Sequence, residues 1–292
     1  MPFAVFFRKK TVTATESALT FTCHDQQLIG IHHSPQYPKN KGVLIVVGGP
    51  QYRAGSHRSF VLLARHLAHN GYPVFRFDYR GMGDSEGEAR TFEGIDDDIR
   101  CALNAFSAAS PNVSEFILWG LCDAASASLY YCGTDARVTG LVLVNPWIRT
   151  TQAQTVLKHY YVRRLAEPAF WKKFVSDGFY LFKAAGSLFN QLRLSAQQNS
   201  REDSDGANDF SERMLSDLRR FKGPVLIVLC GNDLTAKEFK LTTGSSSGWL
   251  QVLKESRFST QELAGADHTF SSQIWRDQIS VWTVDWLAQK FS

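Results

Sequence analysis

The chain has 292 residues, 44% of them hydrophobic, which is enough for one large domain with an insertion or for two small domains. Its formal net charge of +4 is too small to indicate a nucleic-acid partner without a clustered basic patch. The five cysteines include no C-x-x-C pair, so the sequence suggests neither a disulfide framework nor a zinc site. The sequence has neither a secretory signal nor an apolar run of membrane-spanning length, and we expect a cytoplasmic protein without a transmembrane segment.

Strands and helices alternate along the first half of the chain. Strands are expected at 17–23, 27–33, 42–47 and 74–78, and helices at 57–70 and 94–109. The first two strands are separated by three residues and predict an antiparallel hairpin. The later strands are near-continuous apolar runs, typical of strands buried on both faces of a sheet. Alternation of this kind predicts parallel strands joined by right-handed helical crossovers.

The alternation continues through strands at 116–121 and 141–145 and then stops at Pro146. We expect a helical insertion over 147–222, with a polar loop at 196–209. Strands at 224–230 and 258–263 resume the pattern, with helices near 236–254 and up to Lys290. The sequence therefore predicts an α/β core made of 1–146 and 223–292, interrupted by a cap.

The strand at 116–121 leads into Gly-Leu-Cys-Asp-Ala, residues 120–124. This has the pattern of a nucleophile elbow, G-x-S-x-G, with Cys122 at the serine position and Ala124 at the last glycine. The turn would hold Cys122 above the sheet, and the positive end of the following helix would favour its thiolate. The alternative is a structural cysteine in an ordinary strand-to-helix turn.

The chain resembles the α/β-hydrolase superfamily over nearly its whole length. Four motifs carry this resemblance in order: Val47-Gly48-Gly49-Pro50, Asp78 to Ser85, Gly120 to Ala124, and Gly265-Ala266-Asp267-His268. The resemblance implies a mostly parallel eight-stranded sheet flanked by helices, with a helical cap insertion. The cysteine elbow is similar to that of dienelactone hydrolases, and the motif details resemble the first type of exosortase A system-associated hydrolases, which are bacterial proteins.

The resemblance implies a triad of Cys122, His268 and Asp233. His268 follows the last strand, where the fold would place the base, and Asp233 follows the strand ending at Cys230. Asp267, beside the histidine, is the second candidate for the acid. The plainer interpretations are an exposed loop histidine and an aspartate in a turn.

An oxyanion hole needs backbone amides, and one should come from Asp123, the residue after the nucleophile. The second depends on how the Gly48-Gly49-Pro50-Gln51 loop aligns with the family motif. Proline has no N–H to donate. We favour Gly49 and keep Gln51 as the alternative.

Arg53, His57 and Arg58 lie on the loop and helix start beside the expected pocket. They are candidates for binding an anionic substrate, although a solvated helix start is an equal alternative. No acidic residue occurs between Gly48 and Val74, so the local sequence offers the two arginines no partner.

Two groups of charged residues, one at 78–84 and one at 96–98, resemble functional motifs. Asp78, Arg80 and Asp84 resemble an active-site motif, but we expect them to order a loop. The run 96–98 is Asp-Asp-Asp and resembles a metal cluster, but successive residues of a helix point in different directions, so we expect a solvated face.

The sequence therefore predicts a hydrolase of a small-molecule ester or thioester with a Cys-His-Asp triad, an acyl-enzyme intermediate and no metal or organic cofactor. An acyltransferase with a saccharide or alcohol acceptor is the first alternative. The second is a non-catalytic scaffold in an envelope or exopolysaccharide system. A cap segment at 158–174, rich in aromatic and basic residues, would cover the pocket or touch a membrane or glycan. The sequence does not define the acyl group or the oligomeric state.

Overall fold

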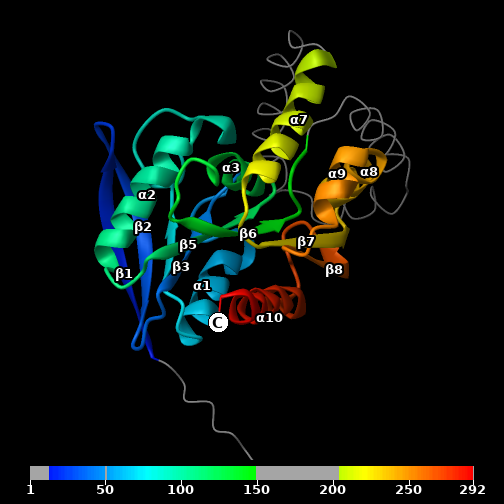
Figure 1. The fold of residues 1–292 in the computed structure, drawn as a ribbon. Coiled ribbons are helices and arrows are strands. Elements are labelled where there is room, and N and C mark those ends of the chain that lie inside the picture. The colour runs from blue at the N-terminus through cyan, green and yellow to red at the C-terminus, as the bar shows by residue number, and fades with distance from the viewer. Residues whose placement is uncertain (1–12, 50, 149–203, 292) are drawn as a thin grey trace, which may run out of the picture. The chain divides into compact units, whose positions relative to one another are not determined.

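An eight-stranded sheet forms the centre of the main unit, in the order β1-β2-β4-β3-β5-β6-β7-β8 (Figure 1). The computed structural model of the chain describes residues 13–49, 51–148 and 204–291. The strands are β1 (Ala14–Cys23), β2 (Gln26–Pro35), β3 (Lys41–Val46), β4 (Val74–Phe77), β5 (Glu115–Leu121), β6 (Val138–Val144), β7 (Val225–Asn232) and β8 (Phe258–Asp267). β2 is antiparallel to both β1 and β4, and the other neighbours pair in parallel. The mostly parallel eight-stranded sheet predicted from the sequence is thus confirmed.

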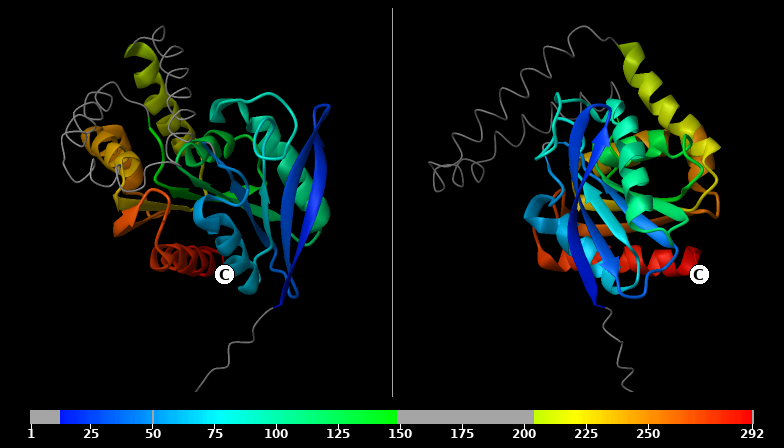
Figure 2. Two further views of the ribbon diagram at one scale, coloured as in Figure 1. Left: turned by 180° about the vertical axis from the view of Figure 1, so that it is seen from behind. Right: turned by 90° about the vertical axis from the view of Figure 1, so that its left-hand side faces the viewer.

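Helices cover both faces of this sheet: α2 and α3 lie on one face, and α1 and α10 on the other (Figures 1 and 2). The helices are α1 (Ser59–His69), α2 (Asp96–Ala109), α3 (Asp123–Tyr131), α7 (Ser204–Arg220), α8 (Leu234–Ser245), α9 (Ser247–Leu253) and α10 (Gln273–Lys290). Short 3₁₀ turns at Ser56–Arg58 and Phe92–Gly94 precede α1 and α2. The β1–β2 hairpin lies at one edge of the sheet (Figure 2).

The central strands are apolar on both faces because both faces are covered. Every residue of β3 from Gly42 to Val46 is buried. One large apolar cluster joins the sheet to Phe60 and Leu67 of α1 and to Trp286 and Leu287 of α10. Burial of such a side chain contributes about 1.5–3 kcal/mol, so this packing fixes the strands and, with them, the loops at their carboxyl ends.

The chain divides into two compact units, residues 1–147 with 214–292, and residues 148–213. The predicted insertion, 147–222, ends nine residues later than the second unit, which ends at Arg213. Met214 and Leu218 of α7, which the prediction had placed in the insertion, are buried and belong to the main unit. α7 also begins at Ser204, inside the stretch 196–209 predicted as a loop. The predicted helical cap, including the segment 158–174, falls mostly on 149–203, outside the described residues.

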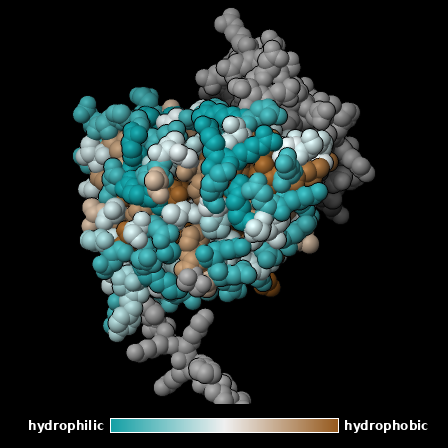
Figure 3. Space-filling model, viewed as in Figure 1, coloured by the Kyte–Doolittle hydropathy of each residue, from teal (hydrophilic) through white to brown (hydrophobic). Residues whose placement is uncertain are grey.

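The face seen in Figure 3 is mainly hydrophilic. Large apolar side chains that reach solvent within the described ranges are Tyr37, Tyr52, Leu241, Leu250, Ile274 and Val281. None of the helices in the described part of the chain is both long and apolar enough to cross a membrane.

Candidate active site

The turn between β5 and α3 presents Cys122 in a strained backbone conformation. Its φ of 62° and ψ of −123° lie in a region that residues other than glycine rarely adopt, which is a feature of nucleophile elbows. The turn also requires glycine at position 120. A Cβ there would lie 2.5 Å from the backbone of Ala124, because β5 and α3 approach so closely. Sequence and geometry agree on a sharp strand-to-helix turn.

Cys122 differs from the buried cysteines of the chain. It is partly exposed and caps the N-terminus of α3, where the helix dipole favours a negative charge. In contrast, Cys23, Cys132 and Cys230 are buried, and burial raises the pKa of each of these thiols to about 12. The environment of Cys122 is therefore the one suited to a reactive thiolate.

His268 and Asp233 meet at the carboxyl ends of β8 and β7. His268 Nδ1 lies 2.9 Å from Asp233 Oδ2. The other carboxylate oxygen, Oδ1, accepts a hydrogen bond of 3.1 Å from the backbone N–H of Thr235 and caps α8. The cap fixes the carboxylate, and the carboxylate in turn fixes the imidazole ring. The Asp233 side chain is 4% exposed and the His268 side chain 34%, so water reaches the pair only from the side of the histidine.

The electrostatics of His268 connect it to Cys122. Burial lowers the pKa of His268, but hydrogen bonds to Asp233 and Cys122 and the negative charges of both groups outweigh burial and raise this pKa to about 10. Because Nδ1 faces Asp233, Nε2 is the nitrogen left for the thiol. The arrangement keeps His268 protonated at neutral pH, with Asp233 and Cys122 beside it.

Asp267, the second candidate for the acid, holds the turn after β8. Its Oδ1 accepts hydrogen bonds of 3.1 Å from the backbone N–H groups of both Thr269 and Ser271, and its Oδ2 accepts one from the Ser271 hydroxyl. These bonds offset burial and lower the pKa of Asp267. The carboxylate that contacts His268 is that of Asp233.

The two residues expected to form the oxyanion hole contact each other. The backbone N–H of Gly49 donates a hydrogen bond of 2.8 Å to Asp123 Oδ2, and the N–H of Ala124 donates one of 2.9 Å to Asp123 Oδ1. Gly49 has a φ of +56°, which a glycine adopts at low cost. The predicted Gly49 donor is therefore occupied by a side chain in this structure.

Gln51, the alternative donor, lies beside an open pocket between the loops that follow β3 and β4. The pocket is lined by Gln51, Tyr52, Met82, Gly83 and Asp84. Within the described ranges, the side-chain oxygen of Gln51 is buried without a hydrogen-bond partner.

Arg53, a candidate for binding an anionic substrate, has acidic partners from outside its own stretch of the sequence. Its guanidinium pairs with Asp78 and lies 2.7 Å from Asp84 Oδ2, and its backbone N–H donates to Asp78 Oδ1 at 2.6 Å. Both partners follow β4, a neighbouring strand, so the pairing is invisible in the local sequence. Arg53 fastens two loops together, in line with the expected loop-ordering role of Asp78 and Asp84.

His57 and Arg58 are exposed at the start of α1. Both have positive φ, 53° and 60°, which turns the chain sharply into the helix. No hydrogen bond or ion pair of either side chain is seen within the described ranges. These two residues remain available as candidates for binding an anion.

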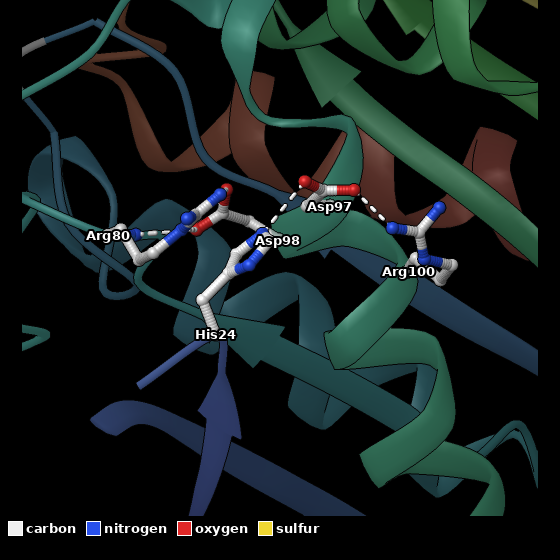
Figure 4. Close-up of polar contacts among 5 residues, drawn as sticks. All are labelled: His24, Arg80, Asp97, Asp98 and Arg100. Carbon is white, nitrogen blue, oxygen red and sulfur yellow. Dashed lines mark hydrogen bonds and ion pairs between the residues drawn. The ribbon is translucent and has the colours of Figure 1, made fainter. Parts of the chain in front are cut away.

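The aspartate run 96–98 at the start of α2 is divided among different partners (Figure 4). Asp98 is fully buried and accepts three hydrogen bonds of 2.8–2.9 Å from the side chain and backbone of Arg80. Asp97 contacts His24 at 2.9 Å and also pairs with Arg100. The expectation of a solvated face is wrong for Asp98, because Arg80 neutralises it inside the protein.

The comparisons with known proteins identify the class. A sequence profile of the alpha/beta hydrolase family matches residues 43–274, and the chain belongs to this family. Human Protein ABHD12B is 35% identical over 81 residues, covering 28% of this chain and 21% of that protein, so the match spans about a fifth of its length.

Solved structures share the fold at low sequence identity. The Pyrococcus furiosus esterase Pf2001 matches with a TM-score of 0.67 and 14% identity, over 96% of this chain and 92% of that one. A carboxyl esterase from Bacillus coagulans matches with a TM-score of 0.64 and 13% identity over 96% and 100% of the two chains. Proline iminopeptidase from Mycobacterium smegmatis gives 0.62 and 13% over 94% and 98%. At this identity the likeness establishes the fold alone.

Proposed function

We propose that the protein is a hydrolase that cleaves an ester or thioester of a small molecule through a covalent thioester on Cys122. The proposal rests on the position of His268. One of its ring nitrogens contacts Asp233, and Cys122 is among the groups that raise its pKa. An aligned acid, imidazole and thiol at the carboxyl ends of β7, β8 and β5 is the arrangement that nucleophilic acyl transfer requires.

The proposed reaction has two steps. The Cys122 thiolate attacks the carbonyl carbon, and the resulting tetrahedral oxyanion collapses as His268 gives its proton to the leaving alcohol or thiol. In the second step, His268 takes a proton from water while the hydroxide attacks the thioester. The tetrahedral oxyanion then collapses, the C–S bond breaks, the carboxylic acid leaves, and the proton that His268 has kept restores the starting pair of imidazolium and thiolate. Asp233 stabilises the imidazolium whenever it forms. The chemistry uses side chains and backbone amides alone.

For substrate binding we propose the open pocket beside Gln51, with His57 and Arg58 at the start of α1 as the groups that attract an anionic substrate. Arg53 is left out of this role because its charge is already paired. A helical cap formed by residues of the insertion, the cytoplasmic location and the resemblance to exosortase-associated hydrolases belong to the same proposal.

An acyltransferase is the second candidate, because a thioester intermediate reacts with alcohols and amines as well as with water. The test of both is intact-mass analysis after incubation with a panel of activated esters and thioesters. We expect an acyl adduct on Cys122 that decays in water, and no adduct in Cys122→Ala. An added alcohol that captures the acyl group in the product indicates a transferase. Absence of any adduct on Cys122 would leave the scaffold interpretation.

A further inference from the structure

The carboxylate of Asp123 binds a backbone amide that is expected to stabilise a substrate oxyanion. Its Oδ2 binds the Gly49 N–H at 2.8 Å, and its Oδ1 binds the Ala124 N–H at 2.9 Å. The Gly49 amide, one of the two expected to stabilise an oxyanion, thus already faces a negative group supplied by the protein.

The loop after β3 is shaped around this carboxylate. A Cβ on Gly48 would lie 2.0 Å from Asp123 Oδ1 and 2.7 Å from the Ala124 nitrogen. A residue larger than glycine at position 48 would therefore expel the Asp123 side chain or move the loop. An alanine at position 123 would leave the Gly49 amide without this partner, whereas an asparagine would remove the charge but keep one oxygen that can accept from this amide.

We propose that Asp123 is an internal plug of the oxyanion hole: its carboxylate holds the Gly49 amide closed, and acylation requires the carboxylate to release that amide. The inference rests on the proposed acyl chemistry of Cys122. The physical reason is that the Gly49 N–H has a single hydrogen to donate, so it cannot bind the Asp123 carboxylate and a substrate oxyanion fully at the same time. A carboxylate and an oxyanion at that amide would repel each other at short range, in surroundings that screen charge poorly.

Protonation is one way for the plug to open. Burial raises the pKa of Asp123, although the amides of Gly49 and Ala124 and the charge of His268 oppose that effect. The titratable groups facing it are His268 and Cys122, and also Tyr79 after β4, whose pKa is raised by burial and by the Asp123 charge and which therefore stays neutral. A neutral Asp123 keeps an O–H that can donate to the oxyanion, so opening is favoured as pH falls.

A structural role for Asp123 makes the opposite prediction. If the carboxylate merely ties the Gly49 loop to α3, its removal loosens the oxyanion hole and weakens tetrahedral adducts. If it is a plug, its removal frees a donor and strengthens them. Removal of a single oxyanion donor costs about 10²–10³ in rate, so the addition of one should be easily measured.

The experiment compares wild type with Asp123→Asn and Asp123→Ala. The probe is 1,1,1-trifluoroacetone, which adds to Cys122 to form a hemithioketal, with the adduct followed by ¹⁹F NMR. Iodoacetamide alkylation of Cys122 serves as the reference, because alkylation needs the thiolate and forms no oxyanion. Asp267→Asn is the matched control, since it removes a carboxylate next to His268 that does not touch Gly49. Folding is checked by circular dichroism.

At pH 7.5 we expect Asp123→Ala to bind the ketone at least about tenfold more tightly than wild type and Asp267→Asn, relative to their alkylation rates. Asp123→Asn, which lacks the charge but keeps an oxygen that can accept from Gly49, should lie between Asp123→Ala and wild type. Lowering the pH should strengthen the wild-type adduct relative to that of Asp123→Ala. An equal or weaker adduct in folded Asp123→Ala would overturn the plug and leave the acyl chemistry standing. If Cys122 forms no adduct in any of the four proteins, the proposed function fails, and the plug fails with it.

Discussion

His268 Nδ1 lies 2.9 Å from Asp233 Oδ2, although 35 residues separate the two in the sequence. The contact exists because β7 and β8 pair in parallel, so that the loops at their carboxyl ends lie side by side. A register shift between Cys230 and Asn232 brings Asn232 opposite Asp267, directly before Asp233 and His268. Cys122, Asp233 and His268, the proposed nucleophile, acid and base, follow one another along the chain in the order typical of the alpha/beta hydrolase fold.

Replacement of the acid tests this relationship. In Asp233→Asn the amide can present an N–H to His268 Nδ1 and select the wrong tautomer of the ring. We expect turnover of the best activated ester to fall by about 10²–10⁴-fold with little change in KM. Steady-state kinetics on the folded variant provide the measurement. Asp267→Asn, which alters a turn beside the same histidine, should retain most of the activity. Equal losses in the two variants would contradict the assignment of Asp233.

The reactivity of Cys122 gives a second prediction. Its proposed partner His268 has a pKa raised to about 10, so the imidazolium is present at pH 7 and is lost only as the pH rises through about 10. Because Cys122 is partly exposed and lies beside this cation, iodoacetamide at pH 7 should modify it before the buried Cys132 and Cys230. In His268→Ala the labelling of Cys122 at pH 7 should be slower. Peptide mapping of the labelled protein measures this order, and faster labelling of Cys230 in wild type would disprove it.

Much of the fold was predictable because it depends on local patterns. Apolar runs located the inner strands, and the hairpin pattern located the first two. The structure lengthens several strands, for example 258–263 to Phe258–Asp267. The elbow was predictable for the same reason, since the glycine at 120 and the small residues after Cys122 reflect one close contact between β5 and α3. The period of the apolar residues indicates which face of an element is buried, and a glycine indicates where two backbones lie close together.

The pairings across the sheet were not predictable from the sequence alone. Arg53 has no acidic neighbour in its own segment, and it finds Asp78 and Asp84 only because β3 and β4 are adjacent. Asp123 was recognised for its backbone amide, whereas its side chain binds Gly49, which lies 74 residues earlier. The sequence held one sign of this contact. Asp123 is an acidic residue directly after the proposed nucleophile, where an oxyanion is expected to form.

The strained backbone of Cys122 predicts that a glycine at this position makes the protein more stable than an alanine does. Its φ of 62° costs about 1–3 kcal/mol for a residue with a Cβ, and glycine removes that cost while losing about 0.5–1 kcal/mol through backbone entropy. We expect Cys122→Gly to be about 1 kcal/mol more stable than Cys122→Ala, with both variants inactive. Urea denaturation of the two proteins is the measurement. Equal stabilities would mean that the turn stores no strain at this residue.

His33, one of the two buried histidines of β2, predicts a loss of stability in acid. His33 accepts a hydrogen bond of 2.9 Å from Arg76 Nε, and burial together with the Arg76 charge lowers the pKa of His33 to about 4. Because this value lies below that of the unfolded state, about 6.5, the contribution to stability is complete above pH 6.5 and is lost as the pH falls toward 4. His33→Gln should lose less stability than wild type between pH 7 and 4.5 in chemical denaturation. Parallel losses in the two proteins would contradict the role of His33.

The two arginines near the pocket should behave differently when each is changed to alanine. Arg53→Ala leaves the fully buried Asp78 carboxylate without its cation, although two backbone amides still bind it. We expect the free energy of unfolding to fall by about 3 kcal/mol, at the low end of the cost of breaking a buried ion pair.

Arg58 is exposed, and Arg58→Ala should change stability by less than about 0.5 kcal/mol. Instead it should reduce the preference in kcat/KM for a carboxylate-bearing ester over its neutral methyl analogue, an effect that added salt weakens. Denaturation curves and paired kinetics on the two variants separate these roles. A stable Arg53→Ala protein, or a charge preference that survives Arg58→Ala, would show that the division between a structural and a substrate-facing arginine is wrong.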